Sequence, residues 1–173
     1  MPDSGHLTIR EWRERWLAKQ PMNGSTPPEV AANLRRYAEL AKRTVAELRP
    51  RQGPNKELRQ TLGDIEAFAF LGFYYAAKIE GACELALFDA DSDPEHQAAA
   101  VKRLEAALGH WRDYAAVYTR QYRQPLLYNR VGIVDIPRLT EQVAADIELA
   151  RVWKPGVIGK APPRKDGGSR FGQ

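Results

Sequence analysis

The sequence predicts an all-α protein: an antiparallel bundle of four to five helices with a long central helical hairpin and a disordered C-terminal tail. Apolar residues recur at intervals of three and four along most of the chain, which is the period of helices packed along one side. Most of these segments begin at a Thr or Asp suited to cap a helix. Short loops join them, which favours antiparallel neighbours.

The first helix is expected to begin after Thr8, because Thr8 and Glu11 have the spacing of a capping box, in which each side chain binds a backbone N–H of the other residue. The helix carries Trp12 and Trp16 on one face, since residues one turn apart lie on the same side. It ends before Pro21, where a turn begins.

The second helix has the same kind of start, with Thr26 as the cap and Glu29 completing a capping box. Its expected inner face consists of Val30, Leu34, Tyr37, Ala41, Val45 and Leu48. Pro50 ends it, because proline cannot continue the backbone hydrogen bonds of a helix.

The third helix is predicted to be the longest, from about residue 55 to residue 88, and to be central, because it is apolar around most of its circumference. One stripe comprises Leu58, Leu62, Ile65, Ala69, Gly72, Ala76, Ile79, Cys83 and Ala86, and a second face adds Phe68, Leu71, Tyr75 and Ala82. Gly63, Gly72 and Gly81 recur along this helix. They indicate either close approach of a neighbouring helix or a kink.

A short loop over 89–92 leads to the fourth helix, capped by Asp93 and opened by Pro94. Its stripe comprises Val101, Leu104, Leu108, Trp111, Ala115, Tyr118 and Tyr122. Residues 124–134 are irregular but apolar, so we expect them to fold back on the bundle. Asp135 then caps a fifth helix, with Pro137 in its first turn. Residues 1–153 are thus predicted to form a single helical domain, followed by a flexible basic tail over 154–173.

Composition excludes several classes of protein. The net charge is +4, and the basic residues are scattered outside the tail, so no dedicated nucleic-acid binding is expected. The lone cysteine, Cys83, is expected to be a small buried hydrophobe. No apolar run approaches the about 20 residues of a membrane span. The N-terminus lacks the apolar core of a signal peptide, and the compartment stays open.

No catalytic or cofactor motif is present, and no metal site is expected. Glu80 and Glu84 share a helix face, but the Glu-x-x-His partners of dimetal bundles are missing, so they are interpreted as solvated carboxylates. Arg103 and His110 lie two turns apart on the fourth helix. Such a pair occurs in metal-independent helical ribonucleases, but a boundary histidine without a chemical role is the favoured interpretation.

Aromatic residues are numerous, and flat rings beside hydrogen-bonding side chains suit sugars, which have apolar C–H faces and hydroxyl edges. Trp111, Tyr118 and Tyr122 lie on the core stripe and are assigned to packing. Tyr74 and Tyr114 lie off their stripes and are expected to be free to contact a ligand. The candidate ligand-binding residues are Trp12, Trp16, Tyr74, Asp64, His110 and Tyr114.

Residues 62–79, 107–115 and 139–147 together resemble the helical C-terminal region of large bacterial glycoside hydrolases and carbohydrate-binding proteins. The resemblance spans about residues 26–151. It implies a non-catalytic accessory domain within a larger, exported protein, with an upstream catalytic domain or a carbohydrate as its partner. It assigns no active-site residue to this chain.

Three hypotheses follow. The first is a non-catalytic helical domain associated with a carbohydrate-active protein, which predicts an exposed apolar patch. The second is a dimerisation or scaffold protein, in which the stripes of the second and fourth helices meet across a dimer. The third is a helical ribonuclease, which requires Arg103 and His110 to converge on a cleft.

Overall fold

The computed structural model describes residues 5–129 and 132–158. Within these ranges the elements are α1 (Ile9–Leu17), α2 (Pro27–Leu48), the short 3-10 helix η1 (Arg49–Arg51), α3 (Lys56–Asp91), α4 (Pro94–Gln121), β1 (Leu126–Tyr128), β2 (Gly132–Val134) and α5 (Ile136–Arg151). The predicted all-α fold class is confirmed, since helices account for nearly all of the regular structure described.

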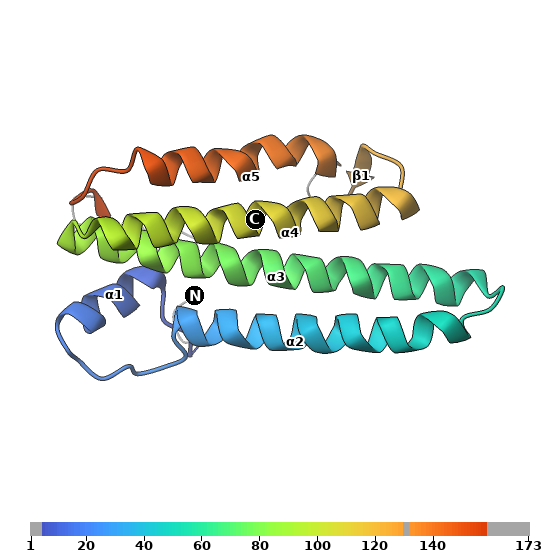
Figure 1. The fold of residues 1–173 in the computed structure, drawn as a ribbon, viewed down its shortest axis with the longest axis horizontal. Helices are drawn as coiled ribbons and strands as arrows, with labels where there is room; N and C mark the ends of the chain where they lie inside the picture. Colours follow the sequence, from blue (N-terminus) through green and yellow to red (C-terminus); the bar gives the residue numbers. More distant parts are fainter. Residues whose placement is uncertain (1–4, 130–131, 159–173) are drawn as a thin grey trace, which may run out of the picture.

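The four long helices lie side by side in chain order, and each packs mainly on its neighbours in the sequence (Figure 1). The hairpin of α3 and α4 is central, with α2 on one side and α5 on the other. Helix α1 packs on α3 through a small cluster made by Trp12, Cys83 and Leu87. In this open row the outer helices have only one long neighbour each, so large parts of α2 and α5 face solvent.

The predicted helix starts are confirmed. Thr8 and Thr26 each form a complete capping box, with Glu11 and Glu29 respectively. Asn55, Asp93 and Asp135 accept hydrogen bonds from backbone N–H groups at the starts of α3, α4 and α5. Each cap satisfies a donor that the first turn of a helix leaves without a partner, which is why these local signals could be identified without the fold.

The predicted loop over 89–92 is wrong at its first residues, because α3 continues to Asp91 and ends at Ser92 in the left-handed region. Asp89 is buried, and its carboxylate accepts hydrogen bonds from Arg13 Nη2 (3.0 Å), Trp153 Nε1 (3.0 Å) and the Val157 N–H (2.8 Å). Burial alone would raise the pKa of Asp89, but these donors outweigh it and lower the pKa.

Asp89 also holds residues that lie beyond the predicted end of the domain at residue 153. The N–H of Gly156 donates to the backbone oxygen of Asp89 at 2.8 Å, and the N–H of Ile158 lies 3.3 Å from the carboxylate. Residues 154–158, predicted to belong to the flexible tail, are therefore attached to the C-terminal end of α3. The rest of the predicted tail, 159–173, lies outside the described residues.

The glycines of α3 mark close helix approaches. A Cβ on Gly72 would lie 3.2 Å from the Cβ of Ala38 in α2, and one on Gly81 would lie 3.0 Å from Cγ of Leu104 in α4. Of the two alternatives that the sequence left open, close approach is therefore the one found at both positions. Glycine allows α2 and α4 to pack more tightly on α3 than a side chain would permit.

Several residues predicted to form the core are exposed. Tyr37 on α2 and Ile65 and Phe68 on α3 have 59%, 39% and 70% of their surface accessible. The apolar arc of α3 is wider than the surface that α2 and α4 cover, so its remaining side stays open. Within the segment predicted to be irregular, β1 and β2 pair as antiparallel strands, and Leu127 and Ile133 also face solvent.

Candidate functional site

A continuous row of aromatic rings runs along α4. Tyr74 of α3 contacts Trp111 with ring centroids 5.1 Å apart, and Trp111, Tyr114, Tyr118 and Tyr122 follow at 5.3, 5.5 and 4.8 Å. The spacing of three and four residues places the α4 rings one turn apart on one side of the helix. We call these five residues the aromatic row.

The prediction that Tyr74 and Tyr114 lie outside the core is wrong, because only 5% and 9% of their surfaces are exposed. Helix α4 packs against α3 on one side and α5 on the other, so its buried arc is wider than a single stripe. Trp12 is also buried, whereas its neighbour Trp16 is 57% exposed. Of the four aromatic candidates, only Trp16 thus has a largely accessible ring.

The aromatic row ends in a cavity of about 460 Å³, which we call the aromatic pocket. Its lining residues are Asp64, Ala67, Phe68, Tyr114, Tyr118, Tyr122 and Tyr128. Phe68 is 70% exposed and Tyr128 is 39% exposed, while Tyr114 is buried beneath them. The pocket therefore brings together two predicted candidates, Asp64 and Tyr114, with aromatic faces that a ligand can reach.

Asp64 is held in place by its neighbours. Tyr122 Oη donates to Oδ1 at 2.8 Å and lies 2.9 Å from Oδ2, and Gln121 Nε2 donates to Oδ1 at 2.8 Å. The hydrogen bond to Asp64 raises the pKa of Tyr122, so Tyr122 stays a neutral donor at ordinary pH. Because a carboxylate has about four acceptor positions, Asp64 can accept further hydrogen bonds from a ligand.

Tyr128 reaches the pocket from the hairpin of β1 and β2. Its hydroxyl makes a hydrogen bond with the hydroxyl of Tyr118, which joins the end of β1 to α4. Burial, followed by this hydrogen bond, raises the pKa of Tyr118. The pocket wall is therefore polar at its hydroxyl groups and apolar at its ring faces.

The sequence predicts only part of this pocket. The apolar stripes place Phe68, Tyr118 and Tyr122 in the core, and Tyr128 is not among the predicted candidates. The one-turn spacing of Asp64 and Phe68 on α3 is a local signal that could have joined them. Tyr128 has no such signal, because only the fold of the hairpin brings it to α4.

Arg103 and His110 have different partners. His110 stacks on Phe73 with ring centroids 5.2 Å apart, and burial lowers its pKa. Arg103 Nη1 lies 3.1 Å from Oε2 of Glu80. The two side chains thus contact different residues, and the arrangement gives the ribonuclease hypothesis no support from geometry.

The sequence predicts that Glu80 and Glu84 are solvated carboxylates, but in the structure both have side-chain partners. Glu80 also accepts a hydrogen bond from Arg35 Nη2 at 2.6 Å, and Glu84 contacts His96 Nδ1 at 2.7 Å. These partners lie on α2 and α4. The sequence predicts that α4 packs beside α3, but it does not give which residues of neighbouring helices meet. Among the described residues no group of three or more His, Cys, Asp or Glu side chains is arranged to hold a metal ion.

No helix in the described part of the chain has the length and apolar character needed to cross a membrane. Comparison of the chain with protein-family models, with curated proteins and with solved structures gives no match. The functional argument therefore depends on the geometry of the aromatic pocket and on the resemblance of the sequence described above.

Proposed function

We propose that this chain is a non-catalytic helical domain that binds a carbohydrate through the aromatic pocket and serves beside a carbohydrate-active module. The observation that carries the proposal is the combination of the exposed Phe68 ring with the fixed carboxylate of Asp64 in one cavity. A sugar ring has an apolar face that packs on an aromatic ring and hydroxyl groups that donate to a carboxylate. Both requirements are met within one pocket of ordinary ligand size.

The rigidity of the pocket also favours binding. Asp64 receives hydrogen bonds from Gln121 and Tyr122, and Tyr118 and Tyr128 share one. A ligand entering such a pocket orders few side chains, so little of its contact energy is lost to conformational entropy.

The test is calorimetric titration of the full chain with a panel of plant and algal polysaccharide fragments. Phe68→Ala is the most informative variant, because the ring is exposed and its removal leaves no cavity in the core. Asp64→Asn keeps the shape of the side chain and removes its charge. We expect each variant to weaken binding at least about tenfold, which corresponds to about 1.4 kcal/mol.

One control variant and one variant of the alternative site locate the binding face. Tyr37→Ala removes another exposed ring, from α2 and outside the pocket, and should leave the affinity unchanged. Trp16→Ala tests the other exposed candidate, on α1. Loss of binding in Trp16→Ala with full binding in Phe68→Ala would move the site to α1. Absence of binding to every fragment would contradict the proposal.

A second candidate function is self-association through α2. Tyr37, Leu40 and Leu48 are exposed by 59%, 50% and 39%, and their spacing places them along one side of the helix. This is an unpartnered apolar row of the kind that a second copy can cover. Sedimentation velocity at increasing concentration tests it, and a monomer at every concentration would rule it out.

A further inference from the structure

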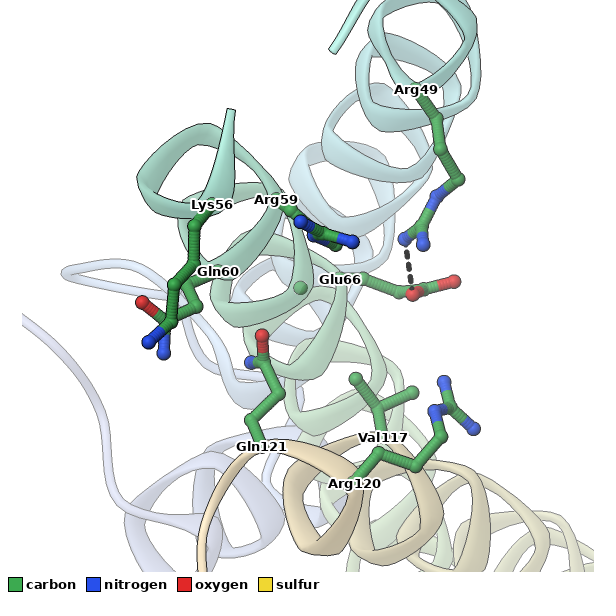
Figure 2. Close-up of a pocket in the computed structure, with 9 residues that line it drawn as sticks. Arg49, Lys56, Arg59, Gln60, Glu66, Val117, Arg120 and Gln121 are labelled. Atoms are coloured by element: carbon green, nitrogen blue, oxygen red, sulfur yellow. Dashed lines mark hydrogen bonds and ion pairs between the residues drawn. The ribbon is translucent and has the colours of Figure 1, made fainter. Parts of the chain in front are cut away.

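A second cavity lies on the other side of the contact between α3 and α4. Gly63 and Gln121 line this cavity, whereas the next residues, Asp64 and Tyr122, line the aromatic pocket. Successive helix residues point about 100° apart, so the two cavities face different directions. The second cavity has a volume of about 450 Å³ and is shown in Figure 2. We call it the basic cleft.

Four cations line the basic cleft: Arg49, Lys56, Arg59 and Arg120. Of the described residues that line the cleft, only Glu66 is acidic, and its Oε2 accepts a hydrogen bond from Arg49 Nη2 at 2.6 Å. Among the described residues, the side chains of Lys56, Arg59 and Arg120 make no ion pair or hydrogen bond. Three positive charges thus remain uncompensated around one concave space.

The fold, and not the local sequence, brings these charges together. Arg49 follows the end of α2, Lys56 and Arg59 lie in the first turn of α3, and Arg120 lies in the last turn of α4. The start of α3 adds the positive end of its helix dipole. Like charges gathered in this way repel one another, and an anion in the cleft would relieve the repulsion.

Gly63 shapes the wall of the cleft. A Cβ at this position would overlap the side-chain amide of Gln121 and displace it, so glycine leaves room for the amide beside α3. Gln121 donates its amide N–H to Asp64, in the direction of the aromatic pocket. Its placement therefore separates the two cavities and lines the basic cleft with a polar amide group.

We infer that the basic cleft binds a small ligand carrying an anionic phosphate or sulfate ester group. Arginine guanidinium groups match the oxygens of such a group in paired hydrogen bonds. The size of the cleft suits a small molecule, whereas a nucleic acid would require a basic surface that continues beyond it. This inference does not depend on carbohydrate binding in the aromatic pocket.

The experiment is calorimetric titration of the full chain, at constant ionic strength, with inorganic pyrophosphate and separately with a sulfated disaccharide. The test variant combines Arg59→Gln with Arg120→Gln, because both side chains are exposed and make no contact that folding requires. The control combines Lys102→Gln with Arg112→Gln, which removes the same charge from exposed positions of α4 outside the cleft. A single-stranded RNA oligomer is titrated in parallel.

We expect saturable binding of at least one small probe, weakened about tenfold or more in the test variant and by less than about twofold in the control. The probe that binds more tightly identifies the source as a phosphate or a sulfate group. Equal weakening in both double variants would overturn the inference, since it would show a general effect of charge. Binding of neither small probe, with or without binding of the RNA oligomer, would also overturn it.

Discussion

Arg13 Nη2 donates a hydrogen bond to Asp89 Oδ2 at 3.0 Å and thereby joins α1 to the C-terminal end of α3. The side chains of Arg13 and Asp89 are 11% and 0% exposed, so this ion pair is almost completely removed from water. Trp153 and Val157 donate to the other carboxylate oxygen. One buried carboxylate therefore holds three separate parts of the chain together.

Replacement of Arg13 should destabilise the protein strongly. Arg13→Ala leaves the charge of Asp89 buried without its cationic partner, which costs about 3–5 kcal/mol in comparable cases. The free energy of unfolding in urea measures the effect. Arg10→Ala is the matched control, because Arg10 forms an exposed pair with Glu14 one turn away and should cost less than about 0.5 kcal/mol. Equal losses in the two variants would show that the buried pair has no special role.

Stability should depend on pH through His96. The hydrogen bond to Glu84 raises the pKa of His96 in the folded protein, with a further contribution from Asp91. The folded protein therefore binds a proton at His96 more tightly than the unfolded chain does, where the histidine pKa is about 6.5. This difference adds to the free energy of unfolding below that pH. The contribution disappears as the pH rises through the pKa of His96 in the folded protein. His96→Gln should therefore lower the free energy of unfolding at about pH 5.5. The variant should match the parent at about pH 9, and an equal loss at both pH values would contradict this assignment.

Two glycine substitutions should have opposite effects. Gly81→Ala places a Cβ 3.0 Å from Cγ of the buried Leu104, whereas Gly109→Ala meets no atom within 4 Å. The gain in helix propensity, about 1 kcal/mol, is common to both variants. The difference between their free energies of unfolding therefore measures the overpacking at Gly81, which we expect to be about 1–3 kcal/mol. Thermal melts should place Gly109→Ala above the parent, and a higher melting temperature for Gly81→Ala would show that Leu104 can move aside.

Cys83 should be unreactive in the folded protein. Burial raises the pKa of its thiol to about 12, with smaller contributions from the charges of Glu84 and Glu80. The thiolate is the reactive form, so labelling by iodoacetamide at about pH 8 should be slow in buffer and fast in denaturing urea. Rapid labelling without denaturant would show that the contact between α1 and α3 opens readily.

Much of the fold could be predicted from the sequence because its signals are local. Thr8, Thr26, Asp93 and Asp135 each cap a helix through a backbone group two or three residues away. Such a contact forms whatever surrounds the helix, so it can be identified before the packing is known. The predicted burial of Cys83 is confirmed for a related reason, since it lies on the apolar stripe that recurs every three or four residues along α3.

The candidate site was only partly predictable. Asp64 and Tyr114 were identified, but they meet Tyr128 only because the hairpin of β1 and β2 folds onto α4. The basic cleft was not predicted, since Arg49 and Arg120 come from helices that the sequence separates widely. Contacts between distant residues leave no periodic signal in a single sequence.

The sequence by itself thus determined the helices, their starts and their antiparallel order, because hydrogen bonds within a helix and short loops depend on nearby residues. Only the tertiary structure decided which faces of those helices meet water. Tyr114 is buried because α3 and α5 both cover α4, while Phe68 is exposed because none of the described helices covers its side of α3. The burial of a residue depends on whether a neighbouring helix covers its face. In this open row, the packing between helices determines which faces are covered.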